Sequence, residues 1–288
     1  MVIKKETIPV SCIILTYNEE KNILNCLKSL YGWIGEIIIV DSFSKDKTIE
    51  IAKQFTDKIY QNPFTTHVEQ WIWAFNNVEL SYEWCLVLDA DQIVSYELKE
   101  ELIDLFKNLP EDIDGFYIKR RQIFRGRWIR FGGYYPKYLL RLFKIKKVFC
   151  DENELVDKHF YVKGKTAKLK NDLIEENLKE NDISFWLEKH IHYAELLAKE
   201  ELIYKKNRKR LVKPSLFGSL EQRIFWLKNI YYHFPLYIRP FLYFFYRYIL
   251  RGGFLDGKEG FLFHFLQGLW YRLIVDIKIE ELNRTKYE

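Results

Sequence analysis

Residues 86–91 read LVLDAD, an apolar run that ends in two carboxylates one residue apart. On a β-strand, residues i and i+2 point to the same side, so Asp89 and Asp91 are expected to converge where this strand ends. Open α/β sheets bind their ligands at the carboxyl ends of the strands. Two carboxylates there suit Mg²⁺ or Mn²⁺ carrying a diphosphate, although a strand that ends in a polar turn would explain the same residues.

The sequence before and after this run alternates between strand and helix periodicity. Apolar runs predict strands at residues 10–15, 36–40, 58–61 and 85–88. Apolar residues at helical spacing predict helices at residues 22–30, 46–55, 68–80 and 97–109. This alternation predicts an α/β fold, with a mostly parallel sheet flanked by helices.

The alternation stops after residue 112. Strand patterns follow at residues 115–124, 138–143 and 166–169, and helical patterns at 183–210, 220–233, 237–251 and 258–283. Proline and glycine separate the helical patterns from one another. We therefore expect an α/β domain over residues 1–180 and a helical region over residues 181–288.

The charge of the chain is unevenly distributed. Residues 116–150 contain eleven Lys and Arg and no Asp or Glu, and residues 205–251 contain eleven against one acid. The net charge is +5, so the remainder is net negative. This layout indicates a basic surface that faces the phosphates of lipid headgroups, of diphosphate-linked substrates or of nucleic acid.

The start of the sequence and the four cysteines indicate a protein of a reducing compartment. The first nine residues mix charges and lead into a strand pattern, so we expect no signal peptide, and no apolar run approaches the roughly 18 residues of a spanning helix. The four cysteines are scattered through or beside apolar segments. They are expected to be reduced, mostly buried thiols rather than disulfides or zinc ligands.

Polar turns follow the first two predicted strands. The first strand runs into TYNEE at residues 16–20, and the second into DSFSKD at residues 41–46. Neither turn is a G-x-G-x-x-G or GK[ST] phosphate loop, so phosphate neutralisation must come from a metal or from Arg and Lys. Helix capping is the competing explanation for Glu19 and Asp46.

Three segments carry a family resemblance: SCIILTYNEEKNILNCLKSL (11–30), EIIIVDSFSKDKTIEIA (36–52) and WCLVLDADQ (84–92). Together they resemble inverting family 2 glycosyltransferases of the GT-A fold. Further segments are similar to the lipopolysaccharide core β-1,4-glucosyltransferase type. These segments are residues 126–136, RLF at 141–143, Asn153-Glu154 and GFLDGKEG at 253–260.

The resemblance implies a UDP-sugar donor and a divalent metal, Mn²⁺ or Mg²⁺. It implies a nucleotide-sugar half over about residues 1–112 and an acceptor half over 113–180. Asp91, with Asp89, would hold the metal that bridges the diphosphate. The residues implied for nucleotide-sugar binding are Thr16, Tyr17, Asn18, Glu19, Asp41, Ser42, Asp89 and Asp91.

An inverting transfer is one in-line displacement, and it needs a carboxylate to accept the proton of the acceptor hydroxyl. Four acids follow the predicted acceptor-side strands: Asp151, Glu152, Glu154 and Asp157. The resemblance points to Glu154 as the general base, with Asp151 as the alternative. A solvated acidic turn would also account for all four. Relatives often have His before this Glu, where this chain has Asn153.

The basic segment between residues 119 and 147 suits contacts with a phosphate or an acceptor, because the guanidinium fork matches phosphate geometry. Such basic residues also occur on the solvated face of a strand. The candidates for phosphate or acceptor contact are Gln70, Arg120, Arg121, Arg130, Tyr135 and Arg141.

The C-terminal helical patterns are rich in aromatic residues. Residues 217–248 contain 13 aromatics, interleaved with Arg and Lys. Such helices are typical of the membrane interface, where rings lie at headgroup depth and cations contact anionic lipid. An ordinary helical core and a single-strand nucleic-acid surface are the alternatives, and we expect no nucleic-acid partner. We expect monotopic attachment at the cytoplasmic face of the inner or plasma membrane.

These observations predict an inverting, metal-dependent glycosyltransferase. It would move a hexose from a UDP-sugar to a lipid-linked or lipopolysaccharide-type glycan at the cell surface. One alternative is a polyprenyl-phosphate sugar synthase, whose phosphate acceptor needs no base. Another is a scaffold that kept the fold without the chemistry. The aromatic helices would also serve a homo-oligomer interface.

Overall fold

The computed structural model describes residues 7–152, 159–207, 213–218 and 220–284. The described residues divide into two compact units. The first contains residues up to Arg130, then Tyr134–Glu152, then residues up to Asp182. The second contains Phe131–Gly133 and the residues from Ile183 onward.

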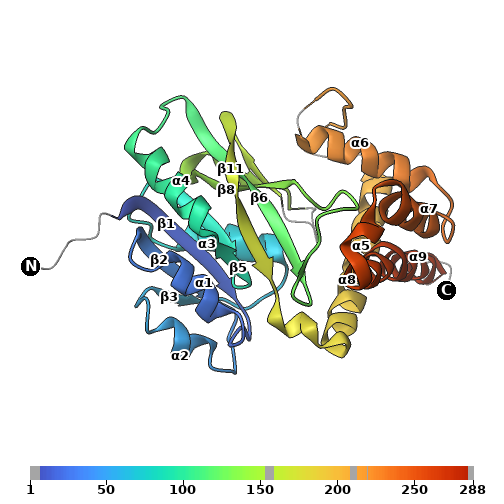
Figure 1. Cartoon of the computed structure of the whole chain (residues 1–288), viewed down its shortest axis with the longest axis horizontal. Helices are drawn as coiled ribbons and strands as arrows, with labels where there is room; N and C mark the ends of the chain where they lie inside the picture. Colours follow the sequence, from blue (N-terminus) through green and yellow to red (C-terminus); the bar gives the residue numbers. More distant parts are fainter. Residues whose placement is uncertain (1–6, 153–158, 208–212, 219, 285–288) are drawn as a thin grey trace, which may run out of the picture. The chain divides into compact units, whose positions relative to one another are not determined.

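The first unit is built on a mixed, mostly parallel nine-stranded sheet in the order β3-β2-β1-β4-β8-β6-β11-β5, with β7 paired to β6 (Figure 1). Parallel pairing joins β3, β2, β1 and β4, and also β6 and β11. The strands are β1 (Ile8–Thr16), β2 (Ile34–Asp41), β3 (Ile59–Gln61), β4 (Trp84–Asp89), β5 (Gln92–Val94), β6 (Ile113–Phe124), β7 (Arg127–Trp128), β8 (Lys137–Lys144) and β11 (Lys165–Glu176). A separate antiparallel pair is formed by β9 (Val148–Cys150) and β10 (Phe160–Val162).

Helices cover both faces of the sheet, which confirms the predicted α/β fold. The helices of this unit are α1 (Ile23–Leu30), α2 (Thr48–Ala52), α3 (His67–Asn77), α4 (Tyr96–Lys107) and the 3₁₀ turns η1 (Ile145–Lys147) and η2 (Leu178–Asn181). Alternate residues of β1 enter two cores, because successive strand side chains point to opposite faces. Cys12 and Ile14 pack with α1 and α4, whereas Ile13 and Leu15 pack with α3 and Phe160 of β10.

Several predicted boundaries in this unit differ from the structure. The second predicted helix, 46–55, is reduced to α2: Asp46 accepts hydrogen bonds from the amide and hydroxyl of Thr48 and lies in the loop before the helix, and residues 53–55 form a turn. The strand predicted at 166–169 is β11, which continues to Glu176. Lys170, Asn171 and Asp172 lie within this strand, at a register shift in the pairing of β11 with β6.

The second unit is helical, as predicted. It contains α5 (Ile183–Asn207), α6 (Leu220–His233), α7 (Arg239–Phe245), π-helical η3 (Tyr246–Leu250), 3₁₀ η4 (Gly253–Asp256), α8 (Gly257–Phe263), π-helical η5 (His264–Trp270) and α9 (Tyr271–Arg284). Ala194, Leu197 and Ala198 of α5 pack against apolar residues of α9. Buried Arg239 is neutralised by Glu201 at 2.8 Å and by Asp276 at 2.5 Å. None of the helices in the described part of the chain combines the length and apolarity needed to cross a bilayer.

His264 makes the stability of the helical unit sensitive to acid. It is 1% exposed and lies against Gly132 and Gly253. Burial, together with the charge of Arg247, lowers the pKa of His264 to about 4. The unfolded chain binds this proton near pH 6.5, so stability is present above that pH and is lost as the pH falls towards 4.

We therefore expect His264 to account for a loss of about 2 kcal/mol in the free energy of unfolding between pH 7 and pH 5. Chemical denaturation at the two pH values measures this loss. His264→Gln removes the titrating group, so its stability should change less over the same interval. Equal pH slopes in the two proteins would contradict the assignment.

Candidate active site

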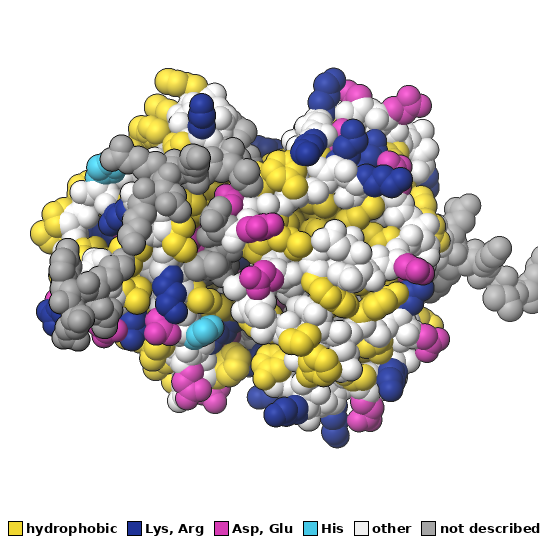
Figure 2. All heavy atoms as spheres, turned by 180° about the vertical axis from the view of Figure 1, so that it is seen from behind, with side chains coloured by type: hydrophobic (Ala, Val, Ile, Leu, Met, Phe, Trp, Pro, Cys, Tyr) yellow, Lys and Arg dark blue, Asp and Glu magenta, His cyan; other side chains and the backbone are white. Residues whose placement is uncertain are grey.

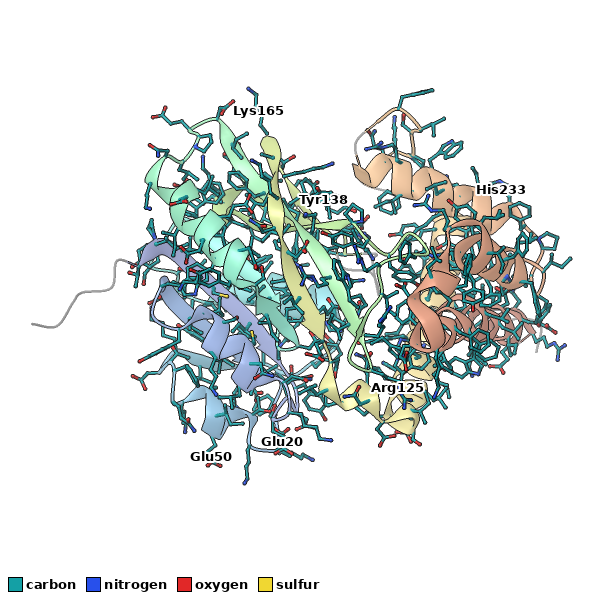
Figure 3. All side chains as sticks on the ribbon, viewed as in Figure 1. Glu20, Glu50, Arg125, Tyr138, Lys165 and His233 are labelled. Carbon is teal, nitrogen blue, oxygen red and sulfur yellow. The ribbon has the colours of Figure 1, made fainter. Side chains whose placement is uncertain are left out.

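Three strand ends bring the predicted donor residues to one edge of the sheet. Thr16 ends β1, Asp41 ends β2 and Asp89 ends β4. Thr16 pairs with Asp41, and Leu15 pairs with Asp89, in parallel register. In Figure 3, Glu20 after β1 and Arg125 after β6 lie at the same end of the sheet, whereas Lys165, which begins β11, lies at the opposite end.

Asp41 is fully buried and organises the loop after β2. Its carboxylate accepts hydrogen bonds from the hydroxyl of Thr16 at 2.8 Å and from the amide and hydroxyl of Ser44 at 2.8 and 2.5 Å. Gln61 donates a further bond at 3.4 Å. With these donors the carboxylate is satisfied inside the protein, so Asp41 fixes the shape of the loop.

The loop after β1 is held against its neighbours by side-chain contacts. Asn18 has a positive φ of 52°, which asparagine tolerates better than most residues, and its side-chain oxygen accepts from the amide of Lys45 at 2.8 Å. Glu19 accepts from Asn22 at 2.7 Å and from Lys179 at 2.5 Å. Tyr17 stays 54% exposed between these anchored residues, so its ring is presented at the strand edge.

The two carboxylates of the Asp89–Asp91 turn have different partners. Asp89 pairs with Arg141 of β8, with 3.2 Å between Oδ2 and Nη2. Asp91 accepts from the side-chain amide of Asn177, with 3.0 Å between Nδ2 and Oδ2, and its carbonyl accepts from the amide of Glu176 at 2.9 Å. One carboxylate is thus bound to a cation, and the other is oriented by the segment after β11.

A buried polar chain supports this turn. Gln92 accepts from the amide of Asp89 at 3.1 Å and donates to Glu175 at 2.8 Å. Arg120 of β6 pairs with Glu175 at 3.0 Å. Burial alone would raise the pKa of Glu175, but the charge of Arg120 and the hydrogen bond from Gln92 outweigh it and hold the pKa below its ordinary value. An ionised Glu175 keeps Gln92 in place.

The donor set of the turn fits a divalent cation of the Mg²⁺ or Mn²⁺ kind, since carboxylate oxygens are the ligands that these ions prefer. Within the described residues, no third Asp, Glu, His or Cys gathers with Asp89 and Asp91 to complete a metal cluster. Asp89 and Asp91 are the described residues that would hold such a cation.

A second group of the predicted residues surrounds Trp128. The guanidinium groups of Arg121 and Arg130 lie 4.3 and 4.6 Å from the centre of its ring. Tyr135 meets Trp128 edge to face at 5.0 Å. Asp172 accepts from Tyr135 at 2.9 Å and from Arg121 at 2.7 Å. This cluster presents cations and aromatic rings together, a combination that suits sugars and phosphates.

The remaining predicted residues lie elsewhere. Gln70 is 1% exposed and donates to Ser42 at 3.1 Å, so it supports the loop after β2 and does not join the arginines. Asp151, the alternative base, is buried directly after β9. Glu154, the predicted base, lies outside the described residues. Among the predicted arginines, Arg120 and Arg141 belong to the carboxylate turn, whereas Arg121 and Arg130 belong to the cluster around Trp128.

Sequence reasoning missed four residues that hold this site together: Gln92, Glu175, Asn177 and Lys179. Gln92 directly follows the two carboxylates in sequence, which was an available signal. The other three follow the register shift within β11, and their proximity to the first and fourth strands depends on long-range pairing of β11 with β6 and β5.

The model of glycosyl transferase family 2 matches residues 11–164, more than half of the chain. The chain therefore belongs to glycosyl transferase family 2. By class it is a glycosyltransferase, and its fold is GT-A-like with C-terminal helices.

Individual relatives match shorter segments. An uncharacterized glycosyltransferase of Rickettsia felis is 33% identical over 103 residues, which cover 36% of each chain. The glycosyltransferase SunS of Bacillus phage SPbeta is 34% identical over 108 residues, covering 34% of this chain and 24% of SunS. The aligned part thus spans well under half the length of these relatives.

Two solved structures are similar at low sequence identity. TarS 1-349 of S. aureus has a TM-score of 0.41 and 16% identity, covering 96% of this chain and 91% of TarS 1-349. Glucosyl-3-phosphoglycerate synthase of Mycobacterium tuberculosis, solved with Mn²⁺ and UDP, has a TM-score of 0.32 and 19% identity, covering 40% and 44%.

Asn177 is expected to act as a positioning residue for Asp91. Its amide donates to Asp91 at 3.0 Å, while its oxygen accepts from Asn22 at 3.1 Å, which ties the β4 turn to α1 near the β1 loop. Loss of a hydrogen bond to a carboxylate costs about 1.5 kcal/mol or more, so Asn177→Ala should weaken nucleotide binding about tenfold.

Titration calorimetry of UDP with metal measures this effect. Exposed Asn181, in the same turn, provides the matched control Asn181→Ala. If Asn177→Ala bound UDP as tightly as the control, Asn177 would have no part in the donor site.

Proposed function

We propose that the protein is an inverting, metal-dependent glycosyltransferase that moves a hexose from a UDP-sugar to a lipid-linked or lipopolysaccharide-type glycan. The observation that carries the proposal is the meeting of the β1, β2 and β4 ends. It places the Asp89–Asp91 turn beside two anchored loops, in a chain of glycosyl transferase family 2.

In the proposed donor site, the loops after β1 and β2 bind the nucleoside. Tyr17 and Phe43 are 54% and 50% exposed at these two strand ends, and their rings offer stacking surfaces for a base. Asn18 and Glu19 lie beside them, fixed by Lys45 and Lys179. The hydrogen bond from the amide of Ser44 to Asp41 holds the loop after β2 in place.

Asp91 is the proposed metal residue, because Asp89 is engaged by Arg141 and Asp91 is oriented by a neutral amide. A bound divalent cation supplies neutralisation of the charge that develops on the diphosphate leaving group. Arg141 would add to this neutralisation. It is 5% exposed, and its Nη1 has no hydrogen-bond partner among the described residues, so it can donate to a phosphate oxygen.

The acceptor half would supply the base and the sugar contacts. We propose Glu154 as the general base, with Asp151 as the alternative, in the connection between β9 and β10. The cluster around Trp128 is the proposed acceptor surface, because indole and phenol rings stack on sugars and the flanking arginines pair with phosphates. The lipopolysaccharide core type of acceptor is part of this proposal.

The test is transfer from a UDP-hexose to glycolipids extracted from a bacterial envelope, with the product analysed by nuclear magnetic resonance. The α-linkage of the donor should become a β-linkage in the product, because one in-line displacement inverts the anomeric carbon. A product with retained configuration would contradict the mechanism. Donor binding without transfer to any extracted glycolipid would contradict the proposed acceptor class.

A further inference from the structure

The helix formed by α7 and η3 exposes a continuous row of large apolar side chains. They occur in adjacent pairs that repeat every four residues, so they share one side of the helix. The exposed fractions are Phe241 55%, Leu242 45%, Phe245 52%, Tyr246 46%, Ile249 44% and Leu250 66%. Six large apolar residues in such a row exceed the scattered exposure that is ordinary on a protein surface.

The row continues beyond the helix. Phe254 and Leu255 of η4 are 49% and 53% exposed. Phe261 is 44% exposed, and its ring lies 5.7 Å from that of Tyr248, which also contacts Phe254 at 6.3 Å. These contacts join the two parts into one surface, which we call the apolar face. Figure 2 shows hydrophobic side chains on the surface of the helical unit.

Exposed basic residues lie beside the apolar face, whereas the acidic residues of the same segment are buried or half-buried. Arg251, directly after η3, and Lys258, in the first turn of α8, are exposed. Between residues 239 and 265 the sequence has two acids, Asp256 and Glu259. Asp256 is 1% exposed and accepts from the amide of Phe131 at 2.9 Å, and Glu259 is half-buried. The exposed charged residues between residues 239 and 265 are therefore both cations, Arg251 and Lys258.

We infer that the apolar face docks in the plane of an anionic lipid bilayer. Apolar and aromatic side chains beside exposed cations match the acyl–headgroup boundary, where rings enter the interface and cations contact lipid phosphates. The described helices are too short or too polar to span a bilayer, so the contact would be interfacial. A protein partner would need an acidic, apolar counterpart, whereas an anionic bilayer offers both features over any area.

Vesicle cosedimentation of the full-length protein tests this inference without any donor or acceptor. We expect binding to vesicles of phosphatidylcholine and phosphatidylglycerol, and weaker binding to phosphatidylcholine alone. The double variant Phe245→Glu/Ile249→Glu should lower the partition coefficient at least about tenfold, since two apolar side chains are lost from the interface. Arg251→Gln/Lys258→Gln should lose roughly fivefold per charge, and on the anionic vesicles alone.

The control is Tyr96→Glu, which charges a 71% exposed aromatic on α4 of the first unit and should bind vesicles like the wild type. Circular dichroism confirms that each variant is folded. Failure of the wild type to bind anionic vesicles would overturn the inference. Mass photometry showing a lipid-free dimer that Phe245→Glu/Ile249→Glu dissociates would reassign the face to a contact between two copies. Neither outcome bears on sugar transfer, because no substrate is present.

Discussion

Replacing Asp91 with alanine is expected to reduce kcat/KM for sugar transfer by about a thousandfold. Asp91 ends the turn after β4, and Asn177 orients its carboxylate. Asp89 cannot readily replace it, because Arg141 pairs with Asp89 at 3.2 Å. The variant should therefore also lose the dependence of UDP binding on metal, which calorimetry with and without a chelator measures.

The matched control for Asp91→Ala is Asp104→Ala. Asp104 lies on α4, where 74% of its side chain is exposed and it pairs with Lys107. It makes none of the contacts described above for the candidate site. It should leave turnover and UDP binding unchanged. Metal-dependent UDP binding that survives in Asp91→Ala would place the cation on other residues.

Glu154→Gln is expected to stop transfer while sparing the donor. A general base contributes about a hundredfold to ten-thousandfold to the rate, so kcat should fall within that range. The donor site is built from β1, β2, β4 and the segment after β11, so the Kd for UDP-sugar should not change. Single-turnover kinetics and calorimetry separate the two effects.

Two further variants and a second acceptor show whether Glu154 is the general base. Glu152→Gln changes an exposed carboxylate of the same connection and should retain activity. If Glu154→Gln retained transfer and Asp151→Asn lost it, the base would be Asp151. If both variants transferred normally to a polyprenyl phosphate, the acceptor would already be ionised, and the enzyme would be a polyprenyl-phosphate sugar synthase.

The fold was largely predictable because the signals for its main elements are local. Buried runs such as residues 36–40 and 85–88 and the helical spacing of residues 22–30 identify their elements without tertiary information. The short strands β5, β9 and β10 were not predicted, since three residues carry no periodicity and their pairing is supplied by distant partners. The end of β11 was not predicted either, because its pairing with β5 and β6 joins segments that are far apart in the sequence.

The candidate site was predictable where it rests on strand ends. Asp89 and Asp91 follow an apolar run, and parallel strands bring their carboxyl ends to one edge. What remained hidden were the partners of these residues. Arg141 pairs with Asp89, 52 residues away in the sequence, and Lys179 pairs with Glu19, 160 residues away. The local sequence pattern does not indicate such long-range contacts.

The most direct measurement is calorimetric binding of UDP-, GDP-, dTDP- and ADP-sugars to the wild-type protein with Mn²⁺, with Mg²⁺ and with a chelator. We expect that a UDP-sugar is selected and that the chelator abolishes its binding. No binding of any of these nucleotide-sugars to folded, lipid-supplemented protein, with or without metal, would contradict this expectation and leave a family 2 fold without its chemistry.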